Sequence, residues 1–157
     1  IKIITMSANS QPNWRTLNSN DTNDEFDYWA SLSADTSPEA MEILTNNFAK
    51  IFWPTFTANT APQAIALMLK HPEFIYWDVL STNTSPDAIP MLRYNPDKVH
   101  IRNLCRNTCP EAIQLLRERH IKYVDWEILA ENPCSEAIQL CREHQDENPK
   151  IKFEFEY

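Results

Sequence analysis

A repeat of 24 residues is the feature of this sequence that most restricts its fold. The pattern W-x-x-L-small-x-N-T-small-P-E-A-I-x-L-L starts at Trp29, Trp53, Trp77, Ile101 and Trp126, with spacings of 24, 24, 24 and 25 residues. A fixed period of this length is typical of proteins in which small units stack and bury their apolar faces against one another. One unit alone buries too little apolar surface to offset the entropy of ordering its backbone, so we expect the units to fold together.

The apolar columns of the aligned units predict two short helices in each unit. The first-column residue and the residue three positions later, as in Trp77 and Leu80, lie on one face of a short helix. Pairs such as Ser37-Pro38 then predict the N-cap and first residue of a second helix. That helix carries an all-Ala column and should end before pairs such as Asn95-Pro96, because the residue before Pro avoids helical angles.

Asn and Asp stand at the junction between the two helices of each unit. The column comprises Asp35, Asn59, Asn83, Asn107 and Asn132, and the whole chain contains no Gly. Asn and Asp tolerate positive φ better than most residues, so we expect this column to end the first helices in the left-handed conformation.

Together these patterns predict an all-α fold, an α-solenoid of about five 24-residue repeats. Each repeat would hold an α-helix and a second short α- or 3₁₀-helix. We expect an N-terminal extension and degenerate capping unit in residues 1–27, the repeats in residues 28–144 and a C-terminal tail in residues 145–157. Apolar and charged residues alternate from Ile151 to Tyr157, which is the period of a half-buried β-strand.

The unit resembles the variant leucine-rich repeat family, in which an α-helix alternates with a 3₁₀-helix. The segment I-R-N-L-C-R-N-T-C-P-E-A-I-Q-L-L, residues 101–116, carries this resemblance. Residues 77–99 also look like the Trp-containing repeats of giant-virus proteins. The resemblance implies a curved α-solenoid and implies no activity. The iron–sulfur cluster of one variant leucine-rich repeat protein lies on a cysteine-rich segment that this sequence lacks.

The residues capable of chemistry do not form a recognisable reaction centre. The four His and four Cys lack metal-ligand or nucleophile–base spacing. Cys105, Cys109 and Cys134 stand in columns of small residues and Cys141 in a Leu column, so we interpret them as structural, reduced thiols of an intracellular protein. The Trp column follows the helix-face period, which favours core packing over a ladder for stacking bases. We expect no catalytic residue, cofactor or metal.

The charge distribution argues against two classes of partner and suggests a third. The net charge of -8 does not favour nucleic acid, and no apolar run approaches the length of about 20 residues that spans a membrane. Residues 93–122 nevertheless carry a net charge of +4. Arginines near the ends of the helices are candidates for a strip that docks an acidic protein segment, including the acidic first unit of another copy: Arg93, Arg102, Arg106, Arg117 and Arg142. The alternative is compensation of helix dipoles and pairing with acids such as Glu118 and Glu143.

The sequence therefore predicts a non-enzymatic scaffold for protein–protein interaction, with self-association as one form of it. The alternative is a structural or cement component of a virus particle or other large assembly. The N-terminal segment IKIITM lacks the features of a secretory signal, so we expect an intracellular or virion-associated protein. Besides the arginines, the apolar side chains of the tail are contact candidates, because an unpaired strand can add to the sheet of a partner: Phe153, Phe155 and Tyr157.

Overall fold

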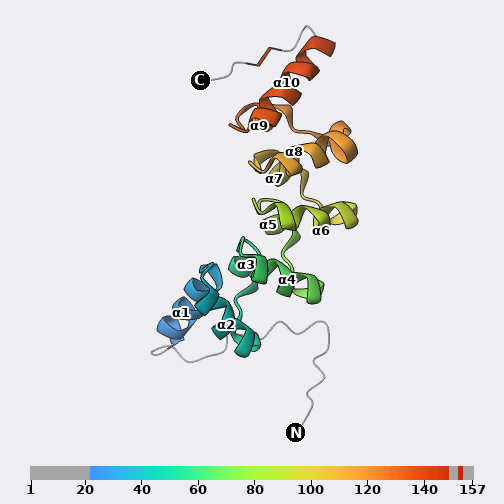
Figure 1. Ribbon diagram of the computed structural model, residues 1–157. Coiled ribbons are helices and arrows are strands. Elements are labelled where there is room, and N and C mark those ends of the chain that lie inside the picture. Colours follow the sequence, from blue (N-terminus) through green and yellow to red (C-terminus); the bar gives the residue numbers. More distant parts are fainter. Residues whose placement is uncertain (1–21, 149–151, 154–157) are drawn as a thin grey trace. The chain divides into compact units, whose positions relative to one another are not determined.

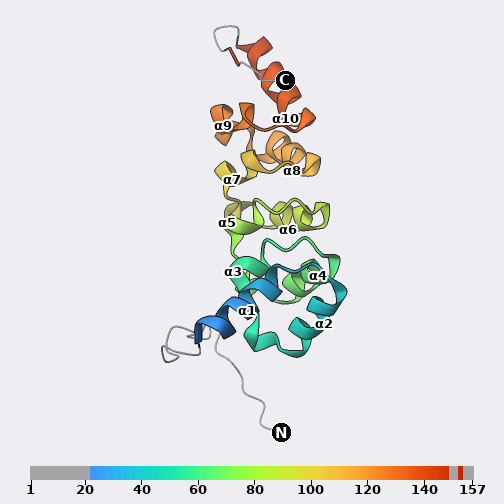
Figure 2. The same ribbon diagram turned by 90° about the vertical axis from the view of Figure 1, so that its left-hand side faces the viewer.

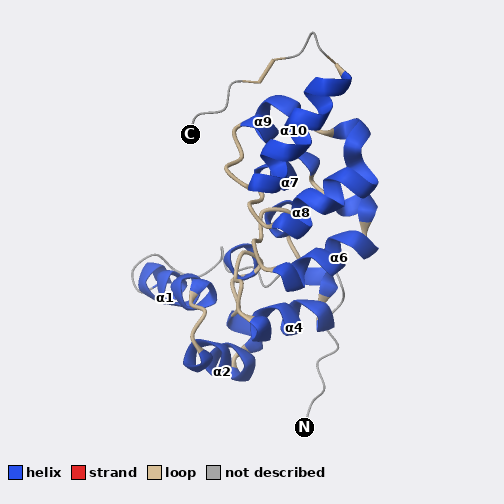
Figure 3. Ribbon diagram, turned by 45° about the horizontal axis from the view of Figure 1, so that its top comes forward, coloured by secondary structure: helices blue, strands red, loops and turns tan. Residues whose placement is uncertain are grey.

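The computed structural model of the chain describes residues 22–148 and 152–153, and all regular elements in these residues are helical (Figures 1 and 3). The predicted all-α class is confirmed for this part of the chain. The chain divides into two compact units, Ile1–Ile75 and Tyr76–Tyr157. Of the expected C-terminal strand, only Lys152 and Phe153 are among the described residues, and they belong to no regular element. The rest of that strand and most of the expected N-terminal extension lie outside the described residues.

The described part of the first unit, residues 22–75, contains four helices and two 3₁₀ turns. They are α1 (Thr22–Ala34), α2 (Pro38–Asn46), η2 (Phe48–Lys50), α3 (Trp53–Phe56), α4 (Pro62–Lys70) and η3 (Pro72–Phe74). Helix α1 contacts both α2 and α3. The boundary expected after residue 27 falls inside α1, because the acidic run contains no Pro or Gly and continues without a break into the helix of Trp29.

The second unit alternates short helices with longer ones. Its elements are α5 (Trp77–Leu80), η4 (Pro86–Ala88), α6 (Ile89–Tyr94), η5 (Pro96–Lys98), α7 (Ile101–Arg106), α8 (Pro110–Leu115), η6 (Leu116–His120), η7 (Ile121–Tyr123), α9 (Trp126–Ala130) and α10 (Ser135–Glu147). Helix α7 contacts α9, and α8 contacts both α6 and α10. Within this unit, α5, α7 and α9 form one row and α6, α8 and α10 a second row (Figures 1 and 2).

The helices begin and end largely where Pro and the capping residues predict. Short helices start at Trp53, Trp77 and Trp126, in the predicted column. Ser37 caps α2, since its Oγ accepts a hydrogen bond from the amide of Ala40 at 3.2 Å. The equivalent Ser85 side chain makes no such bond, and a 3₁₀ turn rather than an α-helix follows it.

The predicted apolar columns form the core. Three columns are buried in all or nearly all repeats. They are the Ala column (Ala40, Ala64, Ala88, Ala112 and Ala137), the column of Leu44, Met68, Leu92, Leu116 and Cys141, and the column of Phe56, Leu80, Leu104 and Leu129. In the Trp column only Trp53 is buried, whereas Trp29, Trp77 and Trp126 are half-buried. The interpretation of this column as core is therefore confirmed for Trp53 and is partly correct for the other three Trp residues.

The Asn column does not end helices in the left-handed conformation, and that prediction is wrong. No described residue has positive φ, and Asn107 itself has φ -69° and ψ 124°, which is extended backbone. Its side chain folds back instead. Oδ1 of Asn107 accepts a hydrogen bond from the amide of Cys109 at 2.9 Å, and this closes the turn without positive φ.

The same Asn side chains also join one repeat to the next. Nδ2 of Asn107 donates to the carbonyls of Ser81 at 3.1 Å and Asn83 at 2.9 Å. Nδ2 of Asn132 donates in turn to the carbonyls of Cys105 at 2.8 Å and Asn107 at 2.9 Å. These amides are buried, so each bond satisfies a main-chain carbonyl that has no access to water.

A π-helical turn explains why one repeat has 25 residues. Residues Leu116–His120 form η6, which extends α8 with the i→i+5 winding of a π-helix. A π turn holds one residue more than the corresponding α-helical turn, so it absorbs the extra residue between Ile101 and Trp126. The columns on both sides of the turn therefore keep their register, as shown by the burial of Leu116 and Leu129.

Candidate functional site

The surroundings of the Trp residues differ from repeat to repeat, and this difference locates the candidate site. In the first unit, the residue 21 positions after Trp53 is Phe74. Their rings stack, with centroids 5.0 Å apart and an interplanar angle of 22°. Phe48 adds an edge contact at 5.6 Å from the Trp53 ring, so aromatic side chains seal this indole from solvent.

In the second unit a cation takes the place of the aromatic ring. The residue 21 positions after Trp77 is Lys98, whose Nζ lies 4.6 Å from the centroid of the indole. This is a cation–π contact within the usual distance of about 6 Å. Lys98 reaches the ring because η5 returns the chain toward Trp77 after α6 has ended at Tyr94.

The equivalent position at Trp126 is Glu147, and here the chain follows a different path. Helix α10 does not end after its second turn; it runs without a break from Ser135 to Glu147, a total of 13 residues. Among the described residues no 3₁₀ turn follows α10. His144 of α10 stacks on Trp126 instead, and a pocket of about 170 Å³ lies beside the indole. This pocket is the candidate functional site.

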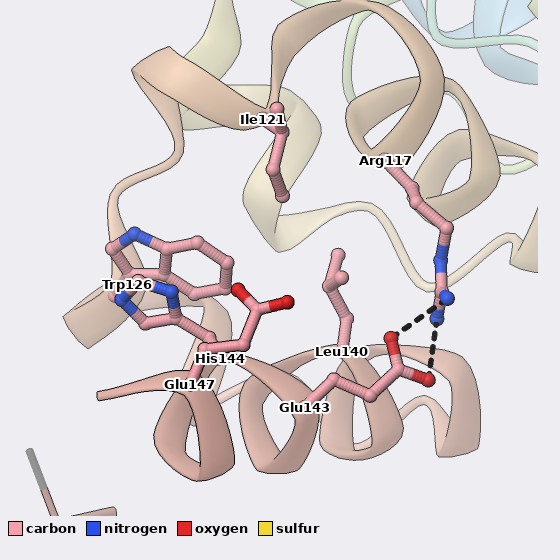
Figure 4. A pocket seen from close by; sticks show the side chains of 7 residues that line it. All are labelled: Arg117, Ile121, Trp126, Leu140, Glu143, His144 and Glu147. Atoms are coloured by element: carbon pink, nitrogen blue, oxygen red, sulfur yellow. Dashed lines mark hydrogen bonds and ion pairs between the residues drawn. The ribbon is translucent and has the colours of Figure 1, made fainter. Parts of the chain in front are cut away.

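The pocket has an aromatic wall and a charged wall (Figure 4). Trp126 and His144 form the first, with ring centroids 3.7 Å apart and an interplanar angle of 1°. Arg117 and Glu143 form the second, joined by an ion pair of 2.7 Å. The carboxylate of Glu147 lies beside the Trp126 ring and points into the space between the walls.

Apolar side chains complete the lining of this pocket. Leu140 is buried on α10 and lies between the two walls, and Ile121 lies above them on η7 (Figure 4). Arg117 belongs to the π turn η6 and Ile121 directly follows it, so the extra residue of this repeat sets the position of two lining side chains. Single π turns are often found at functional sites.

His120, at the end of the π turn, is buried although one of its ring nitrogens makes no hydrogen bond among the described residues. It is 7% exposed, and its Nε2 has no hydrogen-bond partner among the described residues. Burial lowers the pKa of His120 below the ordinary value of imidazole, and the charge of Arg119 lowers it further. His120 does not line the pocket. It occupies the helix-ending position that Asn47 and Asn95 fill in other repeats, where the Asn side chains bond main-chain carbonyls.

The arginines of the expected docking strip mostly pair within the second unit. Arg93 pairs with Glu118, and this hydrogen bond holds the pKa of Glu118 below its usual value. Arg117 pairs with Glu143, and Nε of Arg102 lies 3.3 Å from Asp125. The ion pairs Arg93–Glu118 and Arg117–Glu143 agree with the alternative interpretation of these arginines, in which they pair with nearby acids. All three pairs are exposed to solvent, where each contributes about 0–1 kcal/mol.

The other predicted contact residues do not join the pocket. Arg106 is exposed at the end of α7, and Arg142 is exposed on α10. Phe153 is half-buried and lines no part of the pocket. Phe155 and Tyr157 lie outside the described residues. The sequence prediction therefore named Arg117 but missed the rest of the lining. The signal for it was available in the position 21 residues after each Trp of the column, which holds Lys50, Phe74, Lys98 and Glu147.

The cysteines are confirmed as free, and three of the four are buried. Cys105, Cys109 and Cys141 are shielded from solvent, and burial raises the pKa of Cys141 to about 11, with a further contribution from the nearby Cys105. Among the described residues no group of His, Cys, Asp and Glu is arranged to hold a metal ion. Within residues 22–148 no helix combines the length and apolar character that a membrane crossing requires.

Comparison of the chain with protein-family models, with curated proteins and with solved structures gives no match.

Proposed function

We propose that the chain is a non-enzymatic scaffold, an α-solenoid of about five repeats, that binds a protein partner at the pocket over Trp126. The observation that carries the proposal is the contrast among three Trp residues. Phe74 covers Trp53 and Lys98 covers Trp77, whereas the position equivalent to them leaves a pocket beside Trp126. A half-buried indole in a concave site is a common anchor point of protein interfaces.

The dimensions of the pocket favour a side chain as its occupant. Its volume of about 170 Å³ is below the range of about 300–1,000 Å³ that is typical of cofactor and drug-sized ligand sites. The exposed side chains Ile121 and Tyr123 lie on the neighbouring turn η7 and extend the apolar surface beside the pocket. This combination supports recognition of a polypeptide that inserts one residue and packs against the rim.

A photocrosslinking experiment tests the proposal. A benzoylphenylalanine residue replaces Ile121 at the rim, and crosslinked products are compared between the otherwise unchanged chain, Trp126→Ile and Trp77→Ile. Ile stands in the same column at position 101, so both substitutions should preserve the fold, which circular dichroism checks. We expect a crosslinked partner that is lost in Trp126→Ile and kept in Trp77→Ile. The purified partner must show the same dependence on Trp126 in a binding assay.

Crosslinks that do not change in Trp126→Ile would contradict the proposed function at this site. A failure to crosslink any protein at Ile121, while crosslinks form from an equivalent probe at the exposed Tyr94, would do the same and would move the interface to another surface of the second unit. A crosslink between two copies of the chain that depends on Trp126 would identify the partner as the protein itself.

A further inference from the structure

We infer that the pocket over Trp126 binds a lysine or arginine side chain from a basic segment of a partner protein. This inference rests on the proposed function and specifies the chemistry of the partner. Its starting point is the contact that the chain itself makes at Trp77, where the ammonium group of Lys98 lies 4.6 Å from the indole centroid. At Trp126 the position equivalent to Lys98 is Glu147, which belongs to the continuing helix α10, and the ring of His144 stacks on the indole.

The charges around the pocket select a cation over an aromatic ring. The guanidinium of Arg117 and the carboxylate of Glu143 neutralise each other through their ion pair. Glu147 has no ion pair among the described residues, so one negative charge remains at the pocket. A buried phenylalanine would remove water from this carboxylate without replacing the lost interactions, which is unfavourable. A lysine or arginine would supply the missing charge.

The apolar and aromatic parts of the lining suit the rest of a basic side chain. The aliphatic stem of lysine or arginine can pack on Leu140 and Ile121, which lie between and above the two walls (Figure 4). Its charged end then reaches Glu147 beside the wall of Trp126 and His144. Because His144 stacks on Trp126, the main attraction is the ion pair with Glu147, which is stronger in a partly enclosed site than in open water.

Lys152, in the chain's own C-terminal segment, is exposed to solvent and does not line the pocket. We therefore assign the cation to a second polypeptide. The overall charge of -8 also favours the approach of a basic partner segment.

Three matched peptides test the inference. They are acetylated hexapeptide amides with the sequence of residues 94–99, which contains Lys98, and the same peptide with Lys98→Phe or Lys98→Glu. The three peptides carry Lys, Phe and Glu, the residues that the chain has 21 positions after Trp77, Trp53 and Trp126. Each is titrated into the full-length chain while NMR follows the indole Nε1–H signal of Trp126. Binding by one inserted side chain should be weak, on the order of millimolar, which NMR can measure.

We expect the Lys peptide to shift the Trp126 signal with a dissociation constant about fivefold lower than that of the Phe peptide, and the Glu peptide to give no saturable shift. Glu147→Gln should weaken binding of the Lys peptide by about fivefold, and Trp126→Ile should abolish it. Trp77→Ile is the matched control and should leave binding unchanged. Higher salt should weaken binding of the Lys peptide, because the interaction is partly ionic.

Three kinds of result would overturn the inference, and none of them alone contradicts the proposed function. The first is a Phe peptide that binds as tightly as the Lys peptide, or a Lys peptide that Glu147→Gln does not weaken. The second is a Lys150→Ala/Lys152→Ala variant that binds the peptide more tightly, since it would show that the chain's own lysines compete for the pocket. Absence of any peptide shift would also overturn the inference, and the crosslinking result at Ile121 then decides the proposed function separately.

Discussion

The side-chain amide of Asn132 donates a hydrogen bond of 2.9 Å to the main-chain carbonyl of Asn107, the residue at the equivalent position of the preceding repeat. Asn107 makes the same bond of 2.9 Å to the carbonyl of Asn83. All three side chains are buried. The side-chain NH₂ of each of Asn107 and Asn132 therefore donates to carbonyls of the preceding repeat, and its side-chain oxygen accepts a hydrogen bond from an amide in its own turn. These bonds couple the conformations of successive repeats in the second unit.

This coupling predicts a large effect of Asn107→Asp on stability. A carboxylate cannot donate to the carbonyls of Ser81 and Asn83, and it places a negative charge against two buried oxygens. We expect a loss of about 3 kcal/mol or more in the free energy of unfolding at pH 7, measured by urea denaturation. The loss should be smaller near pH 4, where a protonated carboxyl can donate.

Asn103→Asp is the matched control for this substitution. Nδ2 of Asn103 also donates to a carbonyl one repeat back, that of Asp78 at 2.8 Å, but the contact is exposed to solvent. Water can replace the lost bond, so we expect a loss of less than about 1 kcal/mol. Equal losses for Asn103→Asp and Asn107→Asp would show that burial of the Asn column does not determine its contribution.

The sequence predicted the periodic parts of the fold and failed where a residue has two roles. Columns such as that of Leu44 repeat with one function, apolar burial, and their place in the core follows from spacing alone. The Asn column was assigned to left-handed turns because its position after a helix suggested a cap. Its second role, donating to carbonyls about 24 residues earlier, depends on distances between repeats that spacing does not contain.

The candidate site was harder to predict for a related reason. The pocket arises from a departure from the repeat, since α10 continues to Glu147 where α4 and α6 end at Lys70 and Tyr94. Consensus positions cannot show such a departure. The absence of Pro between Ser135 and Glu147 was the sequence signal for a longer helix, because Pro72 and Pro96 directly follow the helix-ending residues of the earlier repeats.

The buried imidazole of His120 predicts that acid destabilises the fold in a defined pH range. The pKa of His120 is lowered in the folded protein, whereas in the unfolded chain it should be about 6.5. Below this value the unfolded chain binds a proton that the folded protein excludes, so stability falls as the pH decreases from 7.5 to 5.5. The slope is at most about 1.4 kcal/mol per pH unit. Urea denaturation at several pH values measures it.

His120→Asn should remove this part of the pH dependence, because Asn fills the same position at residues 47 and 95 and bonds a main-chain carbonyl there. His71→Asn is the control, since His71 occupies the equivalent position in the first unit and is only half-buried. It should leave the acid slope due to His120 in place. An unchanged slope in His120→Asn would assign the acid sensitivity to other groups.

The thiols should differ in reactivity in the order of their exposure. Burial raises the pKa of Cys141 to about 11, so little thiolate is available. Partial burial and the hydrogen bond to Glu136 also raise the pKa of Cys134, but this side chain is half-exposed and reagents can reach it. With iodoacetamide at pH 8 we expect Cys134 to be alkylated at least about tenfold faster than Cys141, as followed by peptide mass spectrometry. In 8 M urea the two rates should converge. Equal rates in the native protein would show that α10 opens readily around Cys141.

The π turn predicts that one residue can be deleted at a single place in the second unit with little loss of stability. Deleting the exposed Arg119 should convert the turn to α-helical winding and restore the 24-residue spacing before Trp126, so the apolar columns keep their register. We expect a change within about 1 kcal/mol in the free energy of unfolding. Deleting the exposed Tyr94, in a repeat that has no additional residue, should rotate the following columns out of the core and cost about 3 kcal/mol or more. If deletion of Arg119 is as damaging as deletion of Tyr94, the π turn must make contacts that an α-helical turn cannot replace.

The Arg119 deletion variant also tests the link between the π turn and the pocket. Arg117 and Ile121 lie two residues before and two residues after Arg119, and both line the pocket. Binding of the Lys peptide by this variant therefore shows whether the deletion displaces these two lining residues.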